Sequence, residues 1–273
     1  MSVVPLDDDL AGVPTVAWPT VALVGASLSS GVAGAALRAM GHAIPGALCV
    51  YLAGWGAFTA LHEASHGTVG RARWLNAVAG ELASAVLLCR FLAFRQVHQR
   101  HHRHTNDPSR DPDRFTGEGP WWQRPLRLAT TDLHYYVEYD PRALRASSLE
   151  NRLSRWSAAG LLAALAALVA LGRGGDLLLG WVLPIRAALF TAALLTDYLP
   201  HMRPGGAPRA QDPLRHTAQV APSPWFDALS LCHSHHLLHH LWPRVPFYRL
   251  PRAWARHGAA LRAQGARVLG SPR

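Results

Sequence analysis

Histidine is the residue type in this chain that points most directly to chemistry. Nine of the sixteen histidines fall into four groups: His62 and His66; His98, His101 and His102; His201; and His236, His239 and His240. Neutral imidazole is a good ligand for iron, zinc, copper and nickel. Because residues three and four apart lie on one face of a helix, each group directs its rings the same way. One zinc takes only three or four protein ligands, so nine histidines imply two metal ions held almost wholly by nitrogen.

Four apolar segments are long enough, or nearly so, to cross a lipid bilayer. They cover residues 17–37, 44–61, 156–171 and 177–196. Hydrophobic residues make up 49% of the chain and charged residues only 16%, which is unusual for a soluble enzyme. The fourth segment contains Pro184 and Arg186, and an arginine at that depth should face protein or an aqueous cavity. We therefore predict an all-α integral membrane protein with four transmembrane helices.

Four crossings also place all the histidine groups on one face of the membrane. A fifth apolar stretch, residues 74–94, contains Glu81 and Arg90, so we interpret it as an interfacial or re-entrant helix. If it crossed the bilayer, His62 and His98 would lie on opposite faces and could not share a metal ion. The expected organisation is an N-terminal tail (1–16), a membrane domain (17–250) with a helical cap that carries the histidines, and a basic C-terminal tail (251–273).

Basic residues identify the cytoplasmic side. All 27 are arginine, and the formal net charge is +10. Fourteen lie within residues 71–155 and ten within 203–273, whereas the loops on the other side hold only Arg38 and Arg173. Because arginine and lysine accumulate in cytoplasmic loops, we expect a multi-pass protein of the cell membrane with its histidines and both termini in the cytoplasm. The arginines follow the membrane boundary, so anionic lipid head groups explain them better than nucleic acid does.

Two other kinds of metal protein share part of this pattern. His62-Glu63-Ala64-Ser65-His66 matches the H-E-x-x-H helix of zinc metalloproteases, in which the glutamate is a general base. A membrane protease would leave the two H-x-x-H-H groups, which begin at His98 and His236, without a use. A non-catalytic metal-binding or transport protein would need histidines within the spans, whereas these lie beyond the span ends. Both classes stay as minor alternatives.

The histidine groups and apolar segments together resemble the membrane fatty acid desaturase and hydroxylase superfamily over roughly residues 45–250. The resemblance implies four transmembrane helices beneath a cytoplasmic cap with a histidine-ligated di-iron centre. It also implies that nine histidines hold the two iron ions: His62, His66, His98, His101, His102, His201, His236, His239 and His240. Such a centre uses O₂ and electrons to attack an unactivated C–H bond of a lipophilic substrate, which no side chain does alone.

Three segments resemble the β-carotene ring hydroxylases more than the acyl-lipid desaturases. They are Asp197-Tyr-Leu-Pro-His201 with Arg203-Pro204 after it, Thr105 to Asp113, and His236 to Tyr248. Carotenoid ketolases share the Asp-Pro-Asp segment and the Leu-Pro-His turn but usually lack the aspartate at 197. Hydroxylation of a carotenoid ring is therefore the first expectation, and a carotenoid ketolase or a fatty acid (acyl-lipid) desaturase is the alternative.

Four aspartates are candidates for orienting such a centre. In the superfamily an asparagine often precedes the lone histidine by four residues and holds a water on one iron, and this chain has Asp197 there. We hypothesise that Asp197 is a catalytic-site residue that orients an iron-bound water or a histidine. Asp107, Asp111 and Asp113 either accept the outer N–H of ligand histidines or form a turn with exposed carboxylates, and the sequence leaves both possibilities open.

Electrons must come from another protein. The chain has no glycine-rich nucleotide-binding motif, no clustered cysteines for an iron–sulfur centre and no appended haem domain. A small ferredoxin-type donor with its reductase is therefore expected to dock on the basic cap, where salt would slow its approach. The expected partners are this donor, the membrane and a lipophilic substrate, either a carotenoid or an acyl chain.

Overall fold

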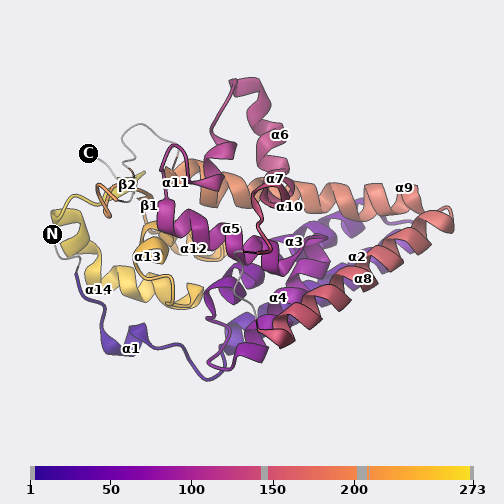
Figure 1. Ribbon diagram of the computed structural model, residues 1–273, viewed down its shortest axis with the longest axis horizontal. Coiled ribbons are helices and arrows are strands. Elements are labelled where there is room, and N and C mark those ends of the chain that lie inside the picture. Colours follow the sequence, from indigo (N-terminus) through magenta and orange to yellow (C-terminus); the bar gives the residue numbers. More distant parts are fainter. Residues whose placement is uncertain (1–3, 143–146, 202–207, 209, 271–273) are drawn as a thin grey trace.

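Four long apolar helices form the body of the computed structural model, which describes residues 4–142, 147–201, 208 and 210–270 (Figure 1). Three are α2 (Trp18–Ala39), α3 (Ala43–His66) and α8 (Ser148–Ala170), and the fourth is a helical run from Gly174 to His201. Each is long and apolar enough to cross a membrane. The prediction of an all-α, multi-pass membrane protein with four spans is confirmed.

The third of these helices is longer than the apolar segment that predicted it. It begins at Ser148 instead of residue 156, because Ser147 and Glu150 form a capping box that stabilises a polar first turn. Arg95 pairs with the same glutamate. The added turns therefore attach this helix to the cap.

Helix α3 lies at the centre of the bundle. All of its residues from 53 to 65 are buried. Helix α2 approaches it closely because Gly34 has no side chain; a Cβ atom there would lie 2.8 Å from the carbonyl oxygen of Gly46. The helix ends at Gly67, whose φ of 73° favours glycine. His62 and His66 therefore lie in the last turns of a membrane helix, not in the loop after it.

The fourth helical run changes its winding twice. It consists of α9 (Gly174–Leu177), the π-helical turn η3 (Leu178–Val182), α10 (Leu183–Ala193), a second π-helical turn η4 (Leu194–Tyr198) and α11 (Leu199–His201). Each π turn ends two residues before a proline, Pro184 or Pro200. Proline lacks an N–H and clashes with the carbonyl four residues earlier, and a wider turn relieves that clash. The second wide turn contains Asp197.

The stretch predicted to be one interfacial helix over residues 74–94 is two helices. Helix α4 (Arg73–Leu87) and helix α5 (Phe91–His104) meet at an angle of 101°. The break occurs at Leu88, whose φ is 58°. The sharp bend returns the chain toward α3, so His98 and His62 lie on the same side.

Shorter elements build the cap, most of which lies toward one end of the bundle in Figure 1. They are η1 (Pro112–Thr116), η2 (Trp121–Gln123), α6 (Arg124–Ala129), α7 (Thr131–Glu138), α12 (Pro224–Leu229), η5 (His233–His235), α13 (His236–Leu241) and η6 (Phe247–Arg249). Two short strands, β1 (Ala218–Val220) and β2 (Arg267–Leu269), pair in parallel, with Gln219 opposite Val268.

Both segments expected to be tails are folded where the structure describes them. The N-terminal segment forms α1 (Asp8–Ala11) and buries Leu10, and the C-terminal segment forms α14 (Leu250–Ala263). Helix α14 buries one face, Leu250, Ala253, Trp254 and Leu261, against the core that also holds Leu10. Arg256 on the same helix binds Asp7 and Asp9 at 2.9 and 2.7 Å. The apolar residues of α14 recur at helical spacing among its arginines, and this pattern distinguishes a packed helix from a basic tail.

Candidate metal centre

Five of the nine predicted histidines converge from three helices. His62 and His66 come from α3, His98 and His102 from α5, and His239 from α13, and one ring nitrogen of each lies within 4.8 Å of the others. The Nε2 atoms of His66 and His98 are 2.9 Å apart, those of His98 and His102 are 3.1 Å apart, and those of His102 and His239 are 3.0 Å apart. We call these five residues the first histidine group.

The other four form a second histidine group beside it. His101 on α5, His201 on α11, and His236 and His240 on α13 also present ring nitrogens within 4.8 Å of one another. Nε2 of His236 lies 3.0 Å from that of His201 and 3.0 Å from that of His240. His101 completes the group, with its Nε2 3.3 Å from that of His240. The structure thus brings together all nine residues that the sequence singled out.

Each H-x-x-H-H motif contributes to both groups. On α5, His98 and His102 point to the first group while His101 points to the second. On α13 the division is reversed, since His239 joins the first group while its neighbour His240 joins the second. The rings of His102 and His240 stack with centroids 4.2 Å apart, so the two groups adjoin. The spacing of the motif explains this, because consecutive residues on a helix point about 100° apart.

The nitrogen geometry fits bound metal ions. Facing Nε2 atoms at about 3.0 Å match neighbouring ligands held near 90° by an ion about 2.1 Å from each, whereas a tetrahedral ion would separate them by about 3.4 Å. His62 is buried, and neither of its ring nitrogens has a hydrogen-bond partner within the described part of the chain. A buried, unpaired nitrogen is costly unless it binds something. The two groups therefore fit two ions that take more ligands than tetrahedral zinc.

Two of the three aspartates near the second motif orient a histidine. Nδ1 of His101 lies 2.7 Å from Asp111 and 3.2 Å from Asp113. Both carboxylates are buried, and the Tyr135 hydroxyl donates to Asp113 at 2.6 Å. Asp107 instead accepts from the amide and hydroxyl of its neighbour two residues on, in an exposed turn. Of the two interpretations that the sequence left open, acceptance from a histidine N–H applies to Asp111 and Asp113, and the exposed turn applies to Asp107.

Burial and nearby charges shift the pKa values of these two carboxylates in opposite directions. The pKa of Asp113 is raised to about 6, mainly by burial, with His101 lowering it and the adjacent Asp111 raising it. Burial also acts to raise the pKa of Asp111, but the attraction of His101 outweighs it and lowers that pKa. Asp111 is thus the carboxylate that keeps its charge and accepts the hydrogen bond from Nδ1–H of His101.

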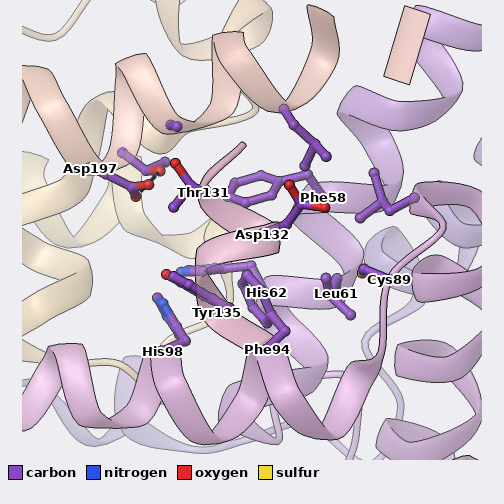
Figure 2. A pocket seen from close by; sticks show the side chains of 14 residues that line it. Phe58, Leu61, His62, Cys89, Phe94, His98, Thr131, Asp132, Tyr135 and Asp197 are labelled. Atoms are coloured by element: carbon purple, nitrogen blue, oxygen red, sulfur yellow. Dashed lines mark hydrogen bonds between the residues drawn. The ribbon is translucent and has the colours of Figure 1, made fainter. Parts of the chain in front are cut away.

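A narrow apolar cavity of about 40 Å³ reaches the first histidine group at His62 and His98. Figure 2 shows Phe58, Leu61 and Phe94 along it, with His62 and His98 at the metal side. Further lining residues are Leu87, Cys89, Thr131, Asp132, Tyr135, Leu189, Ala193, Thr196 and Asp197. Such a lining suits hydrocarbon and excludes water from the space beside the histidines.

Asp197 lies at this cavity, one helical turn before His201. It accepts a hydrogen bond from the Thr196 hydroxyl at 2.7 Å. No hydrogen bond joins Asp197 to a histidine of either group among the residues that the structure describes. Its proposed role toward a bound water therefore remains a prediction. Arg203 and Pro204, which belong to the same sequence resemblance, lie outside the described residues.

Comparison with known proteins decides the family. Residues 40–271 match the family model described as fatty acid desaturase. The chain belongs to the fatty acid desaturase family. The predicted superfamily is thereby confirmed, and the match extends beyond residue 250 into α14 and β2.

The proteins similar to this chain have names that refer to more than one kind of lipid. The chain is 27% identical over 219 residues to beta-carotene 4-ketolase 3 of Haematococcus lacustris, covering 76% of this chain and 60% of that protein. It is 30% identical over 210 residues to zeaxanthin 4-ketolase of Chlamydomonas reinhardtii, covering 76% and 43%. A stretch of 51 residues is 39% identical to sn-1 oleoyl-lipid 12-desaturase of Synechocystis, covering 19% and 14%. The chain thus spans about 60% of the first ketolase's length.

Glu63 has a different task in this desaturase-family chain than in the zinc proteases that share its motif. Its carboxylate accepts hydrogen bonds from the Thr68 hydroxyl at 2.7 Å and from the amide of Phe247 at 3.2 Å. It lies 4.0 Å from Nδ1 of His62. A base for peptide hydrolysis would need to be free for water, whereas this carboxylate joins α3 to η6.

Three histidines near the site lie outside both groups. His233 contacts the Thr59 hydroxyl through Nε2 at 3.0 Å. His235 contacts the Gln219 amide at 2.9 Å. His216 is buried, and its carbonyl oxygen lies 3.2 Å from Nδ1 of His201. A carbonyl contact of this kind has no signature in the sequence.

Proposed function

We propose that this chain is a membrane-bound di-iron oxygenase that uses O₂ and external electrons to hydroxylate a carotenoid ring. The observation that supports it most is a pair of adjoining histidine groups, the first of which lines the end of an apolar cavity. Nitrogen donors spaced for ligand angles near 90° suit iron better than tetrahedral structural zinc. Bound in these groups, iron would supply the oxygen chemistry that cleaves an unactivated C–H bond.

The residues of the chain have three tasks in this proposal. The nine histidines hold the ions, and Asp111 and Asp113 fix the ring of His101 through Nδ1. The apolar walls exclude water and orient the hydrocarbon, so that one C–H bond faces the metal centre. Asp197, at the same cavity, is positioned to orient a water or a proton beside the ions.

Hydroxylation is preferred because Asp197 and the segments around it resemble the ring hydroxylases. Ketolation is a second candidate, since three similar proteins that align over 76% of this chain are named ketolases. A ketone at a ring CH₂ requires two successive oxidations of the same carbon, whereas an alcohol requires one. Both reactions therefore need the same ions. They differ in how long the same ring carbon stays positioned against the metal centre.

We also propose that the electron donor docks at a cleft beside His66. This residue is half-buried, whereas the other eight histidines of the two groups are buried. It opens onto a polar cleft of about 1050 Å³ with Arg73 and Arg103 exposed in its lining. The arginine distribution supports a cytoplasmic position for this cleft. A small acidic redox protein seated there would deliver electrons through the most accessible ligand.

The test is pigment analysis of a β-carotene-producing host that expresses the chain with a ferredoxin and its reductase. Zeaxanthin or cryptoxanthin, absent with His239→Ala, would support ring hydroxylation. Keto-carotenoids would replace it with ketolation. Unchanged carotenoids, with folded protein that binds two irons per chain, would refute the carotenoid proposal, and the host fatty acids would then be searched for a new double bond or hydroxyl.

A further inference from the structure

Arg186, the charged residue within the fourth membrane helix, forms a two-pronged ion pair. Its Nη1 and Nη2 atoms donate to the two carboxylate oxygens of Asp132 on α7 at 2.6 and 2.8 Å. Nη1 also donates to the carbonyl oxygen of Ala129 at 3.2 Å. The two side chains are only 20% and 10% exposed. The charge that the sequence left unexplained is thus neutralised inside the protein, as an arginine at that depth requires.

The middle of α7 is linked to the candidate metal centre. Tyr135 lies one turn after Asp132, and its hydroxyl donates to Asp113 at 2.6 Å. Asp113 in turn lies 3.2 Å from Nδ1 of His101. One short helix is therefore linked through its first turn to the fourth span and through its middle to a carboxylate that orients a candidate metal ligand.

The same face of α7 forms a wall of the cavity. Thr131, Asp132 and Tyr135 all line it, and Phe58 and Phe94 line it from α3 and α5 (Figure 2). The Tyr135 and Phe94 rings lie 5.8 Å apart. Because α7 has only eight residues, it is too short to stay helical and fixed without such contacts. Its position, and hence the width of the cavity, depends on these attachments together with Arg100 of α5, which binds Glu138 at the C-terminal end of α7.

We propose that the ion pair between Arg186 and Asp132 fixes α7 as the wall that sets how far the substrate enters toward the metal centre. Arg186 is then a positioning residue that acts through Asp132. A displacement of about 1 Å in a bound reactant can lower its rate by about 100-fold, so a loose wall would change which carbon reacts. The part of this inference that concerns product selectivity rests on the proposed oxygenase function; the part that concerns the wall does not.

The wall is tested by the reactivity of Cys89, which lines the same cavity. Burial raises the pKa of its thiol, so the intact protein should react slowly with a small membrane-permeant maleimide. Cys49 and Cys232 are replaced by serine in every sample. The double variant Asp132→Leu/Arg186→Met leaves no unpaired charge, and it also removes two opposite influences on the Cys89 pKa together. We expect labelling about tenfold faster than in the parent.

A matched control removes another arginine. Arg173 pairs with Asp176 at 2.5 Å, but both are more than half exposed, so Arg173→Met should leave Cys89 labelling unchanged. Unchanged size-exclusion profile and metal content show that the double variant is folded. Equal labelling rates in the double variant and the parent would overturn the inference.

Product selectivity provides the second readout. In the carotenoid assay the double variant should give a broader set of oxidised positions and at least about tenfold lower kcat, with KM changed less. Arg186→Lys keeps the charge but cannot bind both carboxylate oxygens of Asp132. Its kcat and its range of products should therefore lie between those of the parent and the double variant. If the parent oxidises no carotenoid, the proposed function fails. The labelling result still decides whether the ion pair fixes α7 as the cavity wall. If the parent is active and the double variant matches it in kcat and products, the inference fails.

Discussion

Nδ1 of His101 lies 2.7 Å from Oδ1 of Asp111, and this contact fixes which ring nitrogen faces the second histidine group. An ionised carboxylate only accepts hydrogen bonds, so Nδ1 carries a proton and Nε2 is the ring nitrogen left for a metal ion. Nε2 lies 3.3 Å from the Nε2 atom of His240. The pairing therefore selects the ring nitrogen that a metal ion would bind.

The first prediction concerns this pairing. Asp111→Asn keeps the size of the side chain but weakens its hold on Nδ1, since a neutral amide is a poorer acceptor. We expect about 10–100-fold weaker iron binding at the second histidine group, with the first group retained. Equilibrium dialysis with iron quantified by mass spectrometry measures it. Asp107→Asn, in the exposed turn, is the control, and equal affinities in the two variants would contradict the assigned role.

Asp197 carries a prediction that separates catalysis from metal binding. Asp197→Ala should retain both irons, because none of the described hydrogen bonds joins Asp197 to a histidine of either group. We expect kcat to fall at least about tenfold if the carboxylate orients a water or a proton. Paired measurements of iron content and turnover decide the matter. Complete loss of iron would refute an orienting role.

Glu63 is expected to matter for stability. Glu63→Ala would leave the buried Thr68 hydroxyl and the Phe247 amide without this acceptor, at a cost of about 1–3 kcal/mol. Thermal unfolding in detergent should show a lower midpoint. Glu63→Gln still offers an acceptor oxygen and should cost less. A loss of activity without any loss of stability would instead indicate a direct catalytic role.

The proposed donor cleft predicts a charge effect on electron supply. Arg103→Glu reverses an exposed charge near His66 and should raise KM for an acidic donor several-fold, mainly through a slower association rate. Turnover driven by a small chemical reductant should stay unchanged. Arg173→Glu, at the opposite end of the bundle, is the matched control. The same KM in both variants would place the docking surface elsewhere.

Much of the candidate site could be read from local spacing. The nine histidines, the four apolar segments and the need for one shared membrane face follow from helical periodicity and bilayer thickness, which act along short stretches of chain. The sequence also predicted that the stretch containing Glu81 and Arg90 does not cross. These features do not depend on how distant segments pack.

The tertiary structure decided how those residues are shared and supported. The division of His101 and His102 between two groups, the choice of Asp111 and Asp113 over Asp107, and the pairing of Arg186 with Asp132 all join elements whose relative positions no local pattern specifies. The folded end segments are of the same kind, since α14 is stabilised by apolar contacts with Leu10. Local periodicity determined which residues can do the chemistry, and long-range packing determined which partners hold them in place.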